Sequence, residues 1–427
     1  MIKSEKLRII LLIVIAGFLG YFAGVSKIAF AWNNYQPRIE VSSKEPPPSV
    51  QIGDAGRMWE VLEKIETTFY DKDAINSEKA LNGAIQGMVS SLDDPYTVYL
   101  PPAQNDDFKQ GLAGKFEGIG AELGLKDKNI IVVAPIDGSP AKKAGIKAGD
   151  VIYKVNGQFI SGLALNQVVE KIRGPKGTEV ILSVQQKEGE EPKDIKIVRD
   201  EITVKSLTSW NKKIKDIEGI NDKAEGLANA GENNVIYIRL SQFGDSTNDE
   251  WTTLASSIDR QLSEDENIKG IVFDLRNNPG GYLTDAVYIA SEFVPSGAAV
   301  LQEDKNEKRT AFPVTGKGLL TDVPVVVLVN KGSASASEIV AGALRDSDRA
   351  QLVGETSFGK GTIQQAEDLG GGAGLHVTIA KWLTPNGIWV GNGKDGQGLK
   401  PDVEVPFDTK DPAHDVQLEK AVEELLK

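Results

Sequence analysis

A short turn between an apolar strand and a helix constrains this chain more than any other segment. Residues 323–329 are apolar and rich in valine, which predicts a buried strand. Residues 339–345 repeat apolar side chains at helical spacing, so a helix follows. Between them, Ser335 and Glu338 form the S-x-x-E pattern of a capping box, which places Ser335 at the helix N-cap. A hydroxyl there lies among unpaired N–H groups that stabilise an oxyanion; the alternative is a serine that only caps the helix.

A serine nucleophile needs a base, and the chain holds two histidines. His414 lies at the start of the last helical pattern, where a solvated turn is expected, and His376 lies in an alternating segment typical of a strand. Lys360 is the better candidate, because it follows Phe358 in a glycine-rich turn. A lysine acts as a base only when neutral, so burial must lower its ordinary pKa of about 10.4. The alternative for Lys360 is a solvated loop lysine.

The turn that contains Lys360 also matches a phosphate-binding pattern. Residues 354–360 fit G-x-x-x-x-G-K, the loop of nucleotide hydrolases. That loop requires Ser or Thr after the lysine and a helix beyond it, whereas Gly361 follows here and leads toward the glycine cluster at 370–372. Both the chemistry and the context therefore argue against nucleotide binding.

Composition excludes several classes of function. The chain has 61 acidic and 48 basic residues and a net charge of −13, which argues against nucleic acid as a partner. It has no cysteine, so disulfides, thiol catalysis and thiolate metal sites are excluded. The two histidines are too far apart in sequence for a zinc-protease motif. We expect neither a metal nor another cofactor.

The N-terminus differs from the rest of the chain. Basic residues precede an uncharged run at 9–25, which predicts a single-pass membrane anchor within residues 1–31. The basic flank places the rest of the chain on the extracytoplasmic side of a bacterial cell membrane. The alternative is cleavage at the signal-peptidase-like residues 29–31, which would give a secreted or periplasmic protein. Residues 32–50, with three consecutive prolines, are interpreted as a linker.

The body of the chain divides into three regions by its periodicity. Residues 51–105 show helical spacing, and residues 106–196 alternate short strands and turns with two short helical stretches. Residues 197–427 alternate strands and helices and end in an amphipathic helix. We therefore predict a mixed α/β multi-domain protein whose core carries a largely parallel sheet. Reactive residues of such a core lie on loops at the carboxyl ends of strands.

With these segments assembled, the chain resembles the carboxyl-terminal processing peptidases, also called tail-specific proteases. The resemblance covers residues 51–427. It rests on motifs that appear in the order of the family, at residues 92–100 (LDDPYTVYL), 118–121 (GIGA), 145–150 (GIKAGD), 274–281 (DLRNNPGG), 333–338 (SASASE), 358–361 (FGKG) and 398–402 (GLKPD).

The resemblance implies a role for particular residues of this chain. The family uses a Ser/Lys dyad assisted by a glutamine, which places the nucleophile on Ser335, the base on Lys360 and the glutamine on Gln364. The oxyanion hole would be formed by the backbone N–H groups of Gly281 and Ala336.

Residues 106–196 resemble a PDZ domain, a module that adds a peptide as a strand and holds its terminal carboxylate with backbone N–H groups. The loop that would hold the carboxylate consists of Gly118, Ile119, Gly120 and Ala121. The implied function is that of a serine endopeptidase that binds proteins or peptides with free, apolar C-termini and cuts near those termini. The alternative is a catalytically silent, membrane-tethered PDZ scaffold or adaptor. A homo-oligomer or a regulatory partner stays open.

One stretch departs from the pattern of the family. Residues 211–233 are polar and charged, and they are longer than the usual connection. We predict a surface loop there, between two strands.

Overall fold

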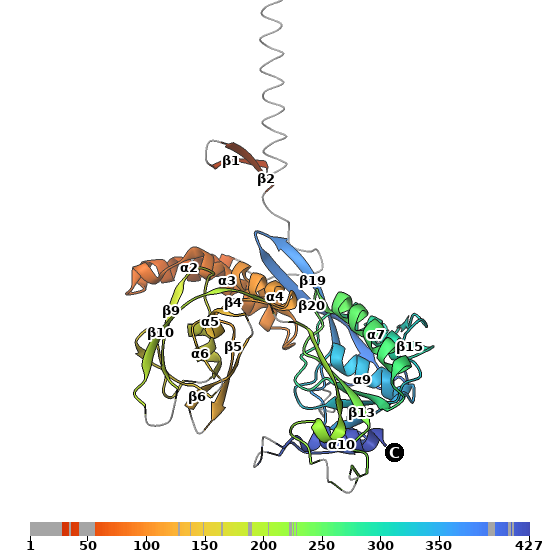
Figure 1. Cartoon of the computed structure of the whole chain (residues 1–427). Coiled ribbons are helices and arrows are strands. Elements are labelled where there is room, and N and C mark those ends of the chain that lie inside the picture. Colours follow the sequence, from red (N-terminus) through yellow and green to blue (C-terminus); the bar gives the residue numbers. More distant parts are fainter. Residues whose placement is uncertain are drawn as a thin grey trace, which may run out of the picture. The chain divides into compact units, whose positions relative to one another are not determined.

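The computed structural model shows two compact units, which divide between Ala80 and Leu81 (Figure 1). The predicted membrane segment at 9–25 lies outside the described residues. No helix in the described ranges has both the length and the apolar character needed to cross a membrane. The structure describes residues 28–33, 36–41, 56–126, 129–136, 138–147, 149–163, 165–186, 190–203, 205–221, 224, 226–227, 229–391, 398–408, 411 and 414–427.

The first unit contains a hairpin and a helix. Strands β1 (Ile28–Asn33) and β2 (Gln36–Val41) pair antiparallel, in a stretch that the sequence analysis divides between membrane segment and linker. Helix α2 (Gly56–Thr68) has the predicted helical spacing but buries none of its residues, and the short helix η1 (Lys72–Ala74) follows it. Helix α3 (Ser77–Ser90) begins in this unit.

A small β domain lies in the second unit, at the residues where a PDZ-like module is predicted. Its sheet has the strand order β10-β9-β7-β6-β5, with β8 beside β7, and all of its pairs are antiparallel. Alternate residues of β9 point inward, so Val180, Leu182 and Val184 are fully buried. The elements are β4 (Lys115–Gly118), β5 (Ala121–Lys126), β6 (Asn129–Pro135), α5 (Pro140–Lys143), β7 (Val151–Val155), β8 (Gln158–Phe159), α6 (Leu165–Ile172), β9 (Glu179–Gln185), β10 (Lys193–Val198) and β11 (Asp200–Thr203), which pairs with β4.

The larger core is built on a sheet with the strand order β12-β13-β14-β17-β18-β21. Within this sheet, β13, β14, β17, β18 and β21 run parallel to one another, and β12 at the edge runs antiparallel to β13. The predicted parallel sheet is therefore present here, whereas the other sheets of the chain are antiparallel, which the sequence analysis did not foresee. The strands are β12 (Leu207–Lys213), β13 (Asn234–Leu240), β14 (Ile268–Asp274), β17 (Val325–Val329), β18 (Ala350–Gly354) and β21 (Val403–Glu404).

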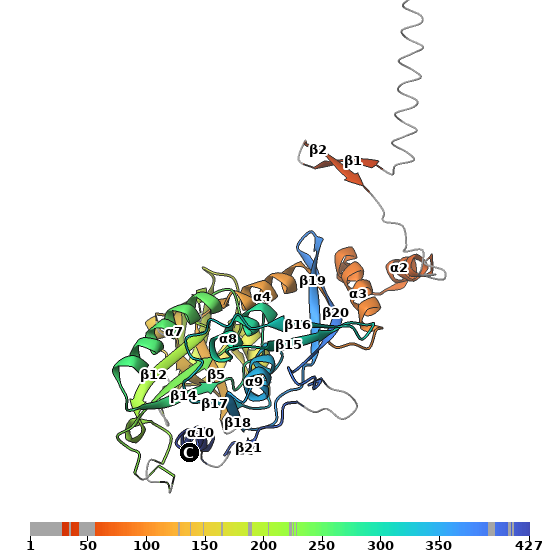
Figure 2. The ribbon, with the colours of Figure 1, turned by 90° about the vertical axis from the view of Figure 1, so that its right-hand side faces the viewer.

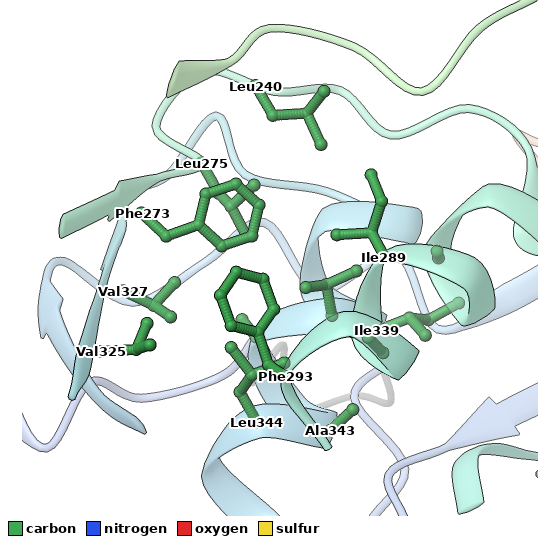
Figure 3. Close-up of a cluster of buried hydrophobic side chains, with 14 of the residues drawn as sticks. Leu240, Phe273, Leu275, Ile289, Phe293, Val325, Val327, Ile339, Ala343 and Leu344 are labelled. Carbon is green, nitrogen blue, oxygen red and sulfur yellow. The ribbon is translucent and has the colours of Figure 1, made fainter. Parts of the chain in front are cut away.

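The central strands are buried on both faces, which explains their uninterrupted apolar sequence. On β17, Val325 and Val327 enter one apolar cluster, and Val326 enters another on the opposite face. Figure 3 shows the first cluster, where Phe273 and Phe293 pack together. Helices α7 (Thr247–Glu264), α8 (Leu283–Phe293) and α9 (Ala336–Asp346) cover this cluster. Helix α10 (Val416–Leu425) covers the second cluster, and Figure 2 labels all four helices.

A separate antiparallel sheet carries the glycine-rich turn of Lys360. Its order is β16-β15-β20-β19, and β3 (Val98–Leu100) pairs with β20. The strands are β15 (Ala298–Glu303), β16 (Arg309–Pro313), β19 (Thr362–Gly370) and β20 (Ala373–Leu383), and helix α4 (Pro102–Leu112) lies between β3 and β4 in the chain.

In the long stretch 211–233, residues 211–213 end strand β12 and the rest connects β12 to β13. The stretch therefore leads from one strand to the next as predicted, but it is not wholly a surface loop. Its short helix η2 (Ile214–Asp216) and the side chains of Ile217 and Leu227 enter the cluster beneath α10. Ile214 and Leu227 are fully buried. The apolar residues scattered along this polar stretch therefore complete the cover of one face of the sheet.

Candidate active site

Two loops meet where the parallel strands β14 and β17 end. The strands are neighbours, with Asp274 opposite Leu328, so the loops that follow them leave the same edge of the sheet. The N–H of Ala334 donates to the carbonyl of Asn278 at 2.9 Å, which fastens the second loop to the first. This topology brings the predicted 274–281 and 333–338 motifs together.

Ser335 has an unusual backbone conformation at this junction. Its φ is 56° and its ψ is −117°, a combination that side-chain-bearing residues rarely adopt and that costs about 1–3 kcal/mol. The predicted capping box with Glu338 is present, and the Glu338 carboxylate accepts the Ser335 N–H at 2.7 Å. The neighbouring loop comes so close that a Cβ on Gly280 would lie 2.8 Å from the Cβ of Ser335. Such a strained residue, held by its surroundings, is typical of a functional site.

The three serines of the turn differ in their surroundings. Ser333 is fully buried, and its Oγ donates to the carbonyl of Leu275 at 2.9 Å. Ser337 is also fully buried, and its Oγ donates to the carbonyl of Ala334 at 2.8 Å. Ser335 is only partly buried, and within the described part of the chain its hydroxyl donates no hydrogen bond. Of the three, Ser335 alone has a hydroxyl proton available for another group.

Two backbone N–H groups beside Ser335 also have no acceptor within the described part of the chain. Phe243 N–H donates to the Gly280 carbonyl at 2.9 Å, and Tyr282 N–H donates to the Phe243 carbonyl at 3.2 Å, so that Gly281 directs its own N–H away from Phe243. Among the described residues, neither Gly281 nor Ala336 donates a backbone hydrogen bond. These are the two N–H groups for which the family resemblance implies a role in an oxyanion hole.

Lys360 lies in a partly buried environment. Its Nζ is 5.1 Å from the centre of the Tyr96 ring, and no ion pair to it occurs within the described ranges. Burial lowers the pKa of Lys360, and the carboxylates of Glu338 and Asp94 oppose that effect. The environment thus favours the neutral amine that a general base requires.

Glu338 joins the turn of Ser335 to the turn of Lys360. One carboxylate oxygen accepts the backbone N–H groups of Ser335 at 2.7 Å and Lys360 at 3.0 Å. The other accepts Ser357 Oγ at 2.5 Å and Gly359 N–H at 2.7 Å. Glu338 is fully buried, and this burial raises its pKa while the four hydrogen bonds lower it. One carboxylate therefore fixes the backbone of both candidate residues.

Gln364 lies on β19, shortly after Lys360. Its side-chain amide donates to Thr362 Oγ1 at 2.9 Å and to Thr378 Oγ1 at 3.1 Å. Thr378 N–H in turn donates to Thr97 Oγ1 at 3.0 Å, which adds to the pairing of β3 with β20 in joining this strand pair to the motif at 92–100. The amide of Gln364 is thus held by two threonines on the same side of the hairpin.

The histidines have other neighbours. His376 stacks edge-on against Phe108 with ring centres 4.5 Å apart, and burial together with the charge of Lys360 lowers its pKa. His414 pairs with Glu419 at 2.8 Å, which raises its pKa. Within the described ranges, no group of three or more His, Asp or Glu side chains is placed to hold a metal ion.

The predicted carboxylate loop of the β domain runs from the end of β4 to the start of β5. The carbonyls of Ile119 and Gly120 accept backbone hydrogen bonds at 2.8 and 2.9 Å, whereas their N–H groups donate none among the described residues. Gly120 has a φ of 72°, and a Cβ there would lie 2.5 Å from the Cβ of Ser139. The loop continues into β5, which is an edge strand of its sheet. An open edge beside two free N–H groups matches the strand-addition mode of peptide binding.

Comparison with known proteins matches three parts of this chain to families. Residues 234–405 match peptidase family S41, residues 131–186 match a PDZ domain, and residues 14–103 match the N-terminal domain of the activating protease CtpB. The carboxy-terminal processing protease CtpA of Bacillus subtilis is 38% identical over 83% of this chain and 70% of its own length. The chain belongs to this family of S41 peptidases.

Other members show the same relationship. The carboxy-terminal processing protease CtpB of Bacillus subtilis is 38% identical over 82% of this chain and 67% of its own length. A probable CtpA-like serine protease of Staphylococcus aureus is 40% identical over 81% of this chain and 63% of its own length. The solved photosystem II D1 C-terminal processing protease is 29% identical, with a TM-score of 0.50 over 82% of this chain and 92% of its own.

Several residues around the candidate site of this S41 peptidase were missed in the sequence. Glu338 was predicted only as half of a capping box, and nothing in the sequence connects it to Lys360. Tyr96 lies in one of the recognised motifs, but its approach to Lys360 depends on the pairing of β3 with β20. Such contacts join distant segments and leave no local pattern.

Proposed function

We propose that the chain is a serine endopeptidase in which Ser335 is the nucleophile and Lys360 is the general base. Ser335 Oγ attacks the scissile carbonyl while Lys360 Nζ takes its proton, and Lys360 then gives that proton to the leaving amine. The acyl-enzyme ester is released by water, which Lys360 deprotonates in the same way. The N–H groups of Gly281 and Ala336 would bind the oxyanion, and Gln364 would assist Lys360.

One observation carries this proposal: Glu338 holds the backbone of a strained, accessible serine and of a partly buried lysine at the same time. A histidine-based triad has less support, because His414 pairs with Glu419 and His376 packs edge-on against Phe108. A silent PDZ scaffold is the second candidate, and it would need neither the strain at Ser335 nor the burial of Lys360.

The experiment is a set of substitutions assayed on a peptide with a free, apolar C-terminus. Ser335→Ala should abolish cleavage, and Lys360→Arg should be as inactive as Lys360→Ala, since a guanidinium stays charged. Cleavage by Lys360→Arg at a rate near that of the unaltered enzyme would exclude the lysine base. The scaffold candidate predicts no cleavage by any form, together with binding of the same peptide.

We propose further that the β domain selects substrates by their C-termini and that cleavage occurs near that end. A terminal carboxylate gains charge-assisted hydrogen bonds from the free N–H groups of Ile119 and Gly120. Amidation of the substrate terminus should therefore raise KM, while an internal change far from both terminus and scissile bond should not. Equal KM values for the acid and the amide would exclude tail recognition.

We also propose that the chain works on the extracytoplasmic side of a bacterial membrane, anchored through residues 1–31. The support is the basic flank followed by the uncharged run at 9–25. Fractionation of cells that express the full chain tests this. The protein is expected in the membrane fraction and accessible to external protease, and recovery in the cytosol would contradict the proposal.

A further inference from the structure

Two tryptophan side chains donate hydrogen bonds to the backbone carbonyls of Lys360 and Gly361, whereas Glu338 accepts the backbone N–H of Lys360. The indole N–H of Trp382 donates to the carbonyl of Lys360 at 2.7 Å. The indole N–H of Trp389 donates to the carbonyl of Gly361 at 2.8 Å, and the backbone N–H of Trp382 reaches the same carbonyl at 3.1 Å. The carbonyls of Lys360 and of the residue after it are thus fixed by two aromatic donors, and the N–H of Lys360 by a carboxylate.

Both indoles are themselves held in place. Trp382 is on β20 and is 1% exposed, within the main apolar cluster of the core. Trp389 pairs with Leu383 across the turn that follows β20, and the Nζ of Lys381 lies 4.6 Å from the centre of its ring. Trp382 is therefore fixed by packing in the core, and Trp389 by its pairing with Leu383 and its contact with Lys381.

The fit between the turn and the second indole explains a glycine of the FGKG motif. A Cβ on Gly361 would lie 2.2 Å from the backbone nitrogen of Gly391 and 2.5 Å from Nε1 of Trp389. Only glycine allows this approach, so the hydrogen bond to Trp389 and the absence of a side chain at 361 depend on each other.

Accurate placement of the backbone matters for a lysine base. The main chain fixes the point and direction from which the flexible four-carbon stem of lysine extends, so a displaced turn moves Nζ unless rotations along the stem compensate for it. A displacement of about 1 Å at a reacting group can reduce a rate about a hundredfold. Trp382 contributes in a second way, because its buried ring belongs to the core next to the turn and helps to keep water away.

We propose that Trp382 and Trp389 are positioning residues that aim Lys360 at Ser335. The inference rests on the proposed Ser/Lys mechanism and deepens it. The two indoles act on the main chain of the base and touch no reacting atom, so their loss should alter turnover more than substrate binding.

The chain offers a matched control in Trp251. Trp251 is also 1% exposed and packs in the same apolar cluster, but its indole N–H is buried without a hydrogen-bond partner in the described part of the chain. Trp251→Phe therefore makes the same chemical change as Trp382→Phe, with a similar loss of volume, and breaks no hydrogen bond.

The test compares Trp382→Phe, Trp389→Phe and Trp251→Phe in kcat, KM and the pH dependence of kcat, on the full chain with a peptide bearing a free C-terminus. Trp382→Phe and Trp389→Phe should each lose about tenfold to a hundredfold in kcat, with KM within about twofold. The rise of kcat with pH should move to higher pH, because a less constrained Lys360 reaches more water and its pKa returns toward the ordinary lysine range. Trp251→Phe should leave kcat, KM and the pH dependence of kcat unchanged.

Folding is checked by thermal unfolding of each variant. Trp389 is only partly buried, so Trp389→Phe keeps the test decisive even where Trp382→Phe is too unstable to assay. If Trp389→Phe matches Trp251→Phe in kcat and pH profile while Lys360→Ala is inactive, the positioning role is refuted and the Ser/Lys mechanism stands. If Lys360→Ala keeps its activity, the mechanism and the positioning role both fail.

Discussion

Replacing Glu338 by glutamine tests whether one carboxylate joins the two halves of the site. Glu338 accepts two hydrogen bonds at each oxygen, from Ser335 and Lys360 on one side and from Ser357 and Gly359 on the other. Glutamine keeps the size of the side chain but turns one acceptor oxygen into an NH₂ donor. The substitution therefore removes acceptors without opening a cavity.

The expected loss of stability follows from the four donors whose hydrogen bonds Glu338 accepts. The least costly orientation of the glutamine turns its NH₂ toward Ser357, whose hydroxyl already accepts the Leu399 N–H at 2.6 Å and can accept one more bond. It leaves the N–H of Gly359 and the hydroxyl proton of Ser357 without their acceptor. A buried N–H without a partner costs about 1–3 kcal/mol. The bonds to Ser335 and Lys360 also lose their charge assistance, which weakens the hold on both turns. We expect Glu338→Gln to lose about 1–3 kcal/mol of unfolding free energy and about tenfold to a hundredfold in kcat/KM.

The assay is urea-induced unfolding together with kcat/KM for a peptide substrate. Glu355→Gln is the control, since Glu355 pairs at 3.2 Å with the exposed Lys331, and such surface pairs contribute about 0–1 kcal/mol. A Glu338→Gln enzyme that matches the Glu355→Gln control in both measurements would refute the reasoning.

Three further predictions concern stability and geometry. Burial lowers the pKa of Lys360, so Lys360→Met should raise the unfolding free energy. The gain should be largest at pH values below that lowered pKa, where the folded protein buries a charged amine, and should shrink as pH rises toward the ordinary lysine range. An equal gain at every pH in denaturant titrations would contradict this. Gly280→Ala should abolish peptide cleavage in the folded protein, because its Cβ would lie 2.7 Å from the Ala334 carbonyl and 2.9 Å from Ala336 N; full activity would show that the loops separate freely. Arg276→Gln should cost about 3–5 kcal/mol in urea unfolding, because the 11% exposed guanidinium pairs with both Asp274 and Asp415, and a loss below 1 kcal/mol would show that neither carboxylate depends on it.

Local patterns in the sequence predicted the elements that carry the site. The helix predicted at 339–345 lies within α9 (Ala336–Asp346), and the capping box at Ser335 and Glu338 begins that helix as expected. Such features depend on neighbours within one or two turns, and the amphipathic helix Val416–Leu425 was found for the same reason.

The contacts that join these elements could not be predicted in the same way. The hydrogen bond from Lys360 N–H to Glu338 joins a turn to helix α9, 22 residues away in sequence. The indole donors Trp382 and Trp389 reach the same turn from segments 22 and 28 residues away from their acceptors, on and after β20. The antiparallel sheets were missed for a related reason, since strand direction follows from tertiary pairing rather than from the periodicity of a single strand. The burial of apolar residues in the 211–233 stretch was not predicted, because these residues are few and lie among polar ones.

Capture of an acyl-enzyme tests the central claim most directly. An activated ester substrate is mixed with the enzyme and quenched in acid, and the modified residue is located by peptide mass spectrometry. The account predicts one acyl group on Ser335, formed rapidly by the unaltered enzyme and not by Lys360→Ala, with Ser333 and Ser337 unmodified. An acyl group on another residue, or equal labelling of Ser335 without Lys360, would contradict it.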